Sequence, residues 1–114
     1  MATYSKQFLS GSTNGRGIKL STTASPGTLI HTSHATGKDE IWLYAYNGHT
    51  ADVVLTLQFG GTTAIDDDII LSVAFKSGLA LVVPGLILSG SSVVRAYAAT
   101  TAVITLSGYV NRIL

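Results

Sequence analysis

The stretch EIWLYAYNGHTADVVLTLQFGG, residues 40–61, decides the predicted fold. It contains two runs rich in β-branched and aromatic residues, and these runs flank a turn with the dipeptide Asn47-Gly48. Such a dipeptide tolerates positive φ, and short apolar runs on either side of it are typical of paired strands. We therefore predict a β-hairpin in which the two runs pair antiparallel.

The side chains of the two runs separate onto faces because successive residues of a strand point to opposite sides. In the second run one face carries Val53, Leu55, Leu57 and Phe59. The first run carries aliphatic side chains on one face and aromatic side chains on the other, namely Ile41, Leu43 and Ala45 against Trp42, Tyr44 and Tyr46. Both faces of the first run are therefore expected to be covered.

The length of the turn decides which face of the first run enters the core. A loop of even length places Trp42 and Tyr44 inside, whereas an odd loop, for example residues 47–51, places Ile41 and Leu43 inside. We favour the odd loop, because aliphatic side chains suit a dry core. Aromatic side chains with polar tips suit contact with water or with a partner, as in subunit interfaces.

The remainder of the chain shows short apolar runs punctuated by Gly, Ser, Pro and Asn, and no helical periodicity. Further strands are expected at residues 18–23, 28–33, 69–76, 79–83, 86–88, 93–98 and 102–113. Pro84-Gly85 is expected at an edge, a bulge or a corner, and Gly108 is a candidate bulge. The predicted fold is an all-β, antiparallel, jelly-roll-like β-sandwich of about eight strands with little or no helix.

The predicted organisation is a short N-terminal segment followed by one domain. Residues 1–10 are expected to form an arm or edge strand with Tyr4 and Phe8 as its large apolar anchors, and residues 11–114 a single β-sandwich domain. The N-terminus lacks the apolar core of a signal peptide. The longest apolar run is interrupted by Pro84-Gly85 and is far shorter than the roughly 20 residues of a membrane helix.

Composition narrows the possible functions. Charged residues are 11% of the chain, well below the roughly 25% of an average soluble domain, and the formal net charge is +1. The basic residues are scattered, so we expect binding neither to nucleic acid nor to an acidic membrane surface. There is no cysteine, which excludes disulfides, thiolate metal sites and a thiol nucleophile.

The polar residues form no recognisable catalytic or metal-binding motif. Asp66, Asp67 and Asp68 are adjacent but lack the other ligands of a calcium loop, so we expect a solvated loop, with a weak cation site or an inter-subunit salt bridge as the alternative. His31, His34 and His49 fit no zinc motif and are expected at the surface. No serine lies in a nucleophile elbow. We predict no enzyme, no metal and no cofactor.

Four segments of the chain resemble short virion proteins of tailed bacteriophages, of the capsid decoration or cement family. They are DEIWLYAYN (39–47), LTLQFGG (55–61), GLALVVPGLILSGSSVVRAYAA (78–99) and ITLSGYVNRI (104–113). The resemblance implies a β-sandwich that sits on the capsid exterior, commonly as a trimer, and clamps neighbouring copies of the major capsid protein. It also implies synthesis in the host cytoplasm.

This reading predicts an interface with the capsid and with other copies of the chain. The residues expected there are Tyr4, Phe8, Trp42, Tyr44, Tyr46, Arg95 and Arg112. Isolated surface charge is the alternative for the arginines, Arg16 included. Two other functions stay open: a carbohydrate-binding module of a tail fibre, in which Trp42, Tyr44 and Tyr46 stack on sugars, and a head-tail connector or tail component, which would form larger rings.

Overall fold

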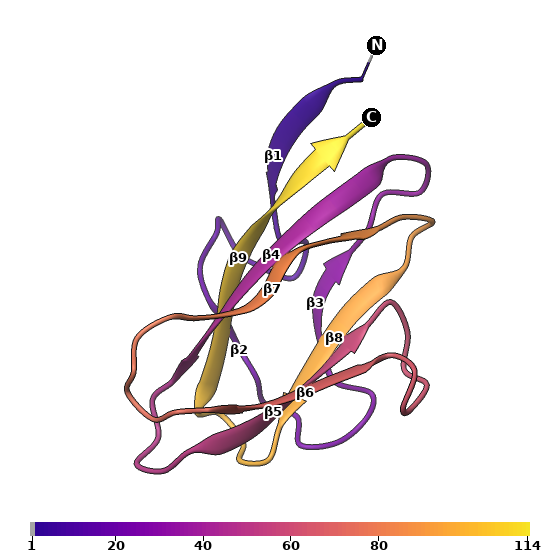
Figure 1. Ribbon diagram of the computed structural model, residues 1–114. Coiled ribbons are helices and arrows are strands. Elements are labelled where there is room, and N and C mark those ends of the chain that lie inside the picture. Colours follow the sequence, from indigo (N-terminus) through magenta and orange to yellow (C-terminus); the bar gives the residue numbers. More distant parts are fainter. Residues whose placement is uncertain (1) are drawn as a thin grey trace.

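The computed structural model describes residues 2–114, which form nine β-strands and no helix (Figure 1). The first residue of the predicted N-terminal arm lies outside this range. The strands build two antiparallel sheets, so the predicted all-β sandwich is confirmed. Their bounds are β1 (Tyr4–Phe8), β2 (Ile18–Lys19), β3 (Thr28–Thr32), β4 (Lys38–Asn47), β5 (Val53–Phe59), β6 (Asp68–Val73), β7 (Ala80–Leu88), β8 (Val93–Ala98) and β9 (Ile104–Ile113).

The strand order is that of a jelly roll. Sheet A has the order β1-β9-β4-β7, with β2 also paired to β9, and sheet B has the order β3-β8-β5-β6. The strands thus pair from the two ends of the chain toward its middle: β1 and β2 pair with β9, β3 with β8, β4 with β7, and β5 with β6. Successive pairs of this nested arrangement belong alternately to sheet A and to sheet B. This is the double Greek key of the jelly roll.

The predicted hairpin between β4 and β5 is wrong, because the two strands belong to different sheets. The chain crosses from sheet A to sheet B over residues 48–52. The buried side chain of Asn47 holds this corner: its amide donates to the carbonyls of Ala51 and Val73 at 3.0 and 2.8 Å, and its oxygen accepts from the N–H of His49 at 2.9 Å. Asn47 therefore stabilises a crossover where the dipeptide indicated a tight turn.

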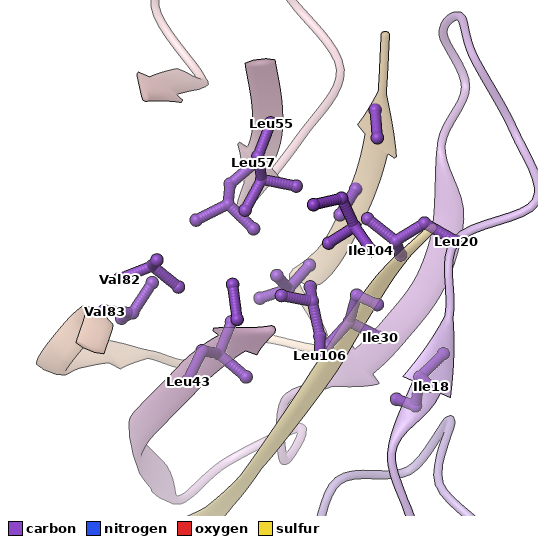
Figure 2. Packing of buried hydrophobic residues seen from close by; sticks show 14 of the residues in the cluster. Ile18, Leu20, Ile30, Leu43, Leu55, Leu57, Val82, Val83, Ile104 and Leu106 are labelled. Carbon is purple, nitrogen blue, oxygen red and sulfur yellow. The ribbon is translucent and has the colours of Figure 1, made fainter. Parts of the chain in front are cut away.

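The faces of β4 and β5 are nevertheless the predicted ones. Ile41, Leu43 and Ala45 are fully buried, as are Leu55 and Leu57, whereas the three aromatic side chains of β4 point away from the core. Figure 2 shows Leu43 and Leu106 of sheet A together with Leu55 and Leu57 of sheet B, in the single core between the sheets. Each fully buried aliphatic side chain contributes about 1.5–3 kcal/mol to that core.

Pro84 and Gly85 lie in a bulge of an edge strand, as predicted. The two apolar runs on either side of them form one strand, β7, at the edge of sheet A. Ile41 is opposite Leu86 and Trp42 is opposite Pro84, so Gly85 is the extra residue. Gly85 has a φ of 82°, and a Cβ on it would lie 2.8 Å from the indole ring of Trp42. The bulge thus makes room for the tryptophan.

The predicted bulge at Gly108 is wrong. β4 and β9 pair without interruption from Lys38 opposite Ile113 to Asn47 opposite Ile104. A Cβ on Gly108 would overlap the carbonyl oxygen of Trp42, so glycine is needed here for close approach of two backbones. A bulge and a close approach leave the same sequence signature, a lone glycine within a strand.

Candidate interaction surface

The outer face of sheet A, the face turned away from the core, carries most of the large exposed apolar side chains of that sheet. Strands alternate, and residues directly opposite one another in neighbouring strands share a face. The register of the sheet therefore brings side chains from β1, β9, β4 and β7 together on this outer face. Its aromatic and aliphatic members are Tyr4, Phe8, Trp42, Tyr44, Tyr46, Leu81, Pro84, Ile87, Tyr109 and Ile113.

One row of this face crosses the whole sheet. Phe8 is opposite Tyr109, Tyr109 is opposite Trp42, and Trp42 is opposite Pro84, so each of the four strands contributes one ring. The rings of Trp42 and Tyr109 are stacked, with centroids 6.4 Å apart and planes 11° apart. The ammonium of Lys6 lies 5.3 Å from the centroid of Tyr109. Such contacts add about 0.5–1.5 kcal/mol each and hold the rings in place.

Glu40 fixes the position of Trp42. Its Oε1 accepts hydrogen bonds from the indole Nε1–H of Trp42 at 2.8 Å and from the side-chain amide of Asn111 at 3.0 Å. The hydrogen bond from Asn111, followed by that from Trp42, lowers the pKa of Glu40 and so favours its ionised form. Glu40 is not among the residues predicted for the interface, although its position two residues before Trp42 in a strand places both side chains on one face.

The exposure of this face is large. Tyr4 is 72% exposed, Phe8 64% and Ile87 53%. Beside Phe8 lies a shallow groove of about 320 Å³, lined by Lys6, Gln7, Phe8 and Tyr109. Five predicted interface residues lie on this face, which are Tyr4, Phe8, Trp42, Tyr44 and Tyr46. The two predicted arginines do not.

The two arginines have partners within the chain. Arg95 lies on β8 in sheet B and donates to the carbonyl of Gly27 at 3.1 Å. Arg112 lies on β9 and donates to both carboxylate oxygens of Asp39, at 2.8 and 3.0 Å. This hydrogen bond raises the pKa of Arg112. Their predicted roles in an interface stay predictions.

Asp39 also contacts His31, which makes a buried polar cluster between the sheets. The Nε2 of His31 lies 2.7 Å from Asp39 Oδ2, and its Nδ1 accepts from the N–H of Ser10 at 3.0 Å, so the ring proton is assigned to Nε2. His31 is 1% exposed, and its predicted surface position is wrong. Because its polar atoms are occupied and it is shielded from solvent, we interpret the cluster as a structural element that joins β3, β4 and β9.

The remaining candidate residues assemble no further site. Within residues 2–114 no group of three His, Asp or Glu side chains is placed to hold a metal ion. Asp67 caps its own loop by accepting from the N–H of Thr63 at 3.0 Å, while Asp66 is exposed. Over the same range there is no helix that is long and apolar enough to cross a membrane.

Comparison of the chain with protein-family models, with curated proteins and with solved structures found no match.

Proposed function

We propose that this protein is a structural virion protein that binds the outside of a tailed-bacteriophage capsid as a homo-oligomer and stabilises it. The observation that supports this proposal best is the outer face of sheet A. On that face Tyr4, Phe8, Leu81 and Ile87 are exposed in a chain with only 11% charged residues. Contiguous exposed apolar surface is characteristic of sites where proteins associate.

The rigidity of this face suits a protein that reinforces another structure. Its side chains stand on hydrogen-bonded strands, and Trp42 is held by Glu40, Tyr109 and the bulge at Gly85. A surface that is already ordered loses little conformational entropy on binding. A symmetric oligomer presents the same face several times, so modest contacts of each copy combine into strong attachment. Rigidity, exposure and low charge thus all favour a role in assembly.

The proposal predicts that attachment depends on the exposed apolar side chains of sheet A. Phe8→Ser and Leu81→Ser should each weaken binding to empty heads, built from the major capsid protein of the encoding phage, by about tenfold, because truncation of a side chain central to an interface costs about 1–2 kcal/mol. Co-sedimentation of the purified protein with the heads measures this. Ile70→Ser, an equally exposed residue on sheet B, is the matched control and should bind as the wild type does.

If Phe8→Ser and Leu81→Ser both bind the heads as tightly as the wild type does, the proposal is contradicted. The protein should sediment neither with liposomes nor with DNA, in keeping with its net charge of +1.

A carbohydrate-binding module is the second candidate, because the stacked rings of Trp42 and Tyr109 lie beside the polar groups of Glu40 and Asn111. Aromatic faces next to a few fixed polar groups are suited to sugar rings. A glycan array probed with the wild type and with Trp42→Ala separates the two functions, since only a sugar-binding protein should retain glycans and lose them in the variant. A connector or tail component would differ in its solution mass.

A further inference from the structure

A basic notch of about 410 Å³ lies beside the loop between β1 and β2. Its cations, Arg16 and Lys19, are exposed, and the ion pairs found within residues 2–114 involve neither of them. The loop is ordered, since Ser12 Oγ donates to the carbonyl of Arg16 at 2.7 Å and the N–H of Arg16 donates to Thr13 at 3.0 Å. The notch is lined further by Thr13, Gly17, Ile18 and Thr105.

An acidic tip, formed by Ile65 and Asp66, projects from the loop between β5 and β6. Ile65 is 84% exposed, the highest value for a large apolar side chain among residues 2–114. The tip is held by a turn in which the N–H of Asp67 donates to Thr63 at 2.9 Å and the N–H of Asp68 donates to Ile65 at 3.1 Å. Asp67 Oδ2 accepts from the N–H of Thr63. An ordered loop thus presents one aliphatic side chain and one carboxylate to solvent.

The notch and the tip are complementary in chemistry but lie at different margins of the sandwich. The notch is next to β2 and β9 in sheet A, and the tip follows β5 and precedes β6, the last strand of sheet B (Figure 1). Opposite charges at two separate places on one molecule favour head-to-tail contact between copies. The other carboxylates are less available, because Asp39 and Glu40 are hydrogen-bonded on β4 and Asp52 accepts from the N–H of Phe75.

We propose that the acidic tip of one copy inserts into the basic notch of the next copy, with Asp66 between Arg16 and Lys19 and Ile65 against the glycine-rich wall near Ile18. Such a heterologous contact uses two different surfaces of each copy, and its repetition gives a ring when the rotation between copies closes on itself. The inference deepens the proposed function by naming the self-association contact. Because Lys19 is opposite Thr105 and Thr105 is opposite Tyr46, the notch lies at the β2 margin of the outer face of sheet A, and the row from Phe8 to Pro84 stays free for the capsid.

The test is a charge swap measured by light scattering over a dilution series of the whole protein at physiological salt. R16D and D66R should each raise the dissociation constant of the oligomer by at least about tenfold, because each replaces an attraction by a repulsion. The combination R16D/D66R should restore assembly in part, with a dissociation constant below that of either single variant, because the new pair attracts while Lys19 still repels the cation at position 66. K76D, which reverses an exposed charge on the loop after β6, should change nothing. Ile65→Ser should weaken assembly and Ile70→Ser should not.

Three results would overturn the inference: a monomeric wild type at every concentration, single reversals that assemble like the wild type, or a double reversal that does not restore assembly. The last result would mean that another anion, such as free phosphate or an acidic partner, occupies the notch. Circular dichroism of each variant identifies any loss of fold. Binding to heads is measured separately. If the wild type binds heads but R16D assembles as the wild type does, only this inference is contradicted. If assembly depends on the two charges but the protein does not bind heads, only the proposed function is contradicted.

Discussion

Asp39 is fully buried and yet ionised, which depends on groups from two other strands. Burial alone would raise its pKa, but the hydrogen bonds from Arg112 and from His31, together with the charge of Arg112, outweigh burial and lower the pKa from 3.8 to about 2. The carboxylate therefore links β4 to β9 within sheet A and to β3 across the sandwich. A buried ion pair of this kind is costly to break from one side.

The low pKa of Asp39 predicts how stability depends on pH. Between the folded value of about 2 and the ordinary value of 3.8, the unfolded chain binds more protons at this site than the folded one, so stability rises with pH in that window. About 2 kcal/mol from this group should be present above pH 4 and lost as the pH falls through about 2. Urea unfolding at several pH values measures it.

Asp39→Asn should be less stable at pH 7 and should lose much of that acid dependence, whereas Asp66→Asn, at an exposed carboxylate, should keep it. An unchanged pH profile in Asp39→Asn would show that other groups cause the acid sensitivity. The sequence could not predict this cluster, because Asp39 is 8 residues from His31 and 73 from Arg112. Only the tertiary structure brings them together.

At the scale of elements, the alternation within each strand was more informative than the turns between strands. The aliphatic face of β4 was correctly assigned to the core, because period-two alternation separates the two faces and aliphatic side chains suit a dry core better than aromatic side chains with polar tips. The partner of β4 was not, since Asn47-Gly48 is compatible with a hairpin and Asn47 instead hydrogen-bonds across a sheet-to-sheet crossover. Pairing with β7 and β9 involves residues more than thirty positions away and leaves no local pattern.

The bulge in β7 gives a prediction at this scale. Gly85→Ala should destabilise the protein by about 1–3 kcal/mol, because alanine is strained at a φ of 82° and its Cβ would press on the indole of Trp42. Trp42 is the single tryptophan of the chain, so its fluorescence should shift as well. Gly48→Ala, where the nearest atom is at an ordinary 3.4 Å, should have a small effect in both measurements. Equal behaviour of the two variants would contradict the role given to the bulge.

At the scale of the whole molecule, the short apolar runs separated by Gly, Ser, Pro and Asn predicted an all-β, jelly-roll-like sandwich, but they did not predict which strand pairs with which. Nine strands of this kind fit many sandwich topologies, and the choice among them is made by which apolar faces cover each other in the shared core. β9 is central to that choice. It pairs with β1, β2 and β4, and it contributes Ile104, Leu106 and Val110 to the core.

Removal of β9 should therefore abolish the fold. A chain that ends at Val103 should show no cooperative unfolding transition by circular dichroism, because sheet A loses the strand that joins its parts. A chain that lacks residues 2–8 is the control: β1 pairs only with β9 and contributes no buried residue, so the remaining sandwich should unfold cooperatively at a lower urea concentration. A cooperative transition in the chain without β9 would refute this assignment.

The place of β9 as the last strand in the order of synthesis has a consequence for the cell. While the ribosome is still translating, β1, β2 and β4 have no partner on the side that β9 will occupy, and β4 carries apolar side chains on both faces. Sheet A cannot close until β9 has been synthesised and inserts between β1 and β4, which is slow for such distant pairings. Until then the edges of β1, β2 and β4 that β9 will cover are unpaired, and unpaired edges are the places where strands of different copies join.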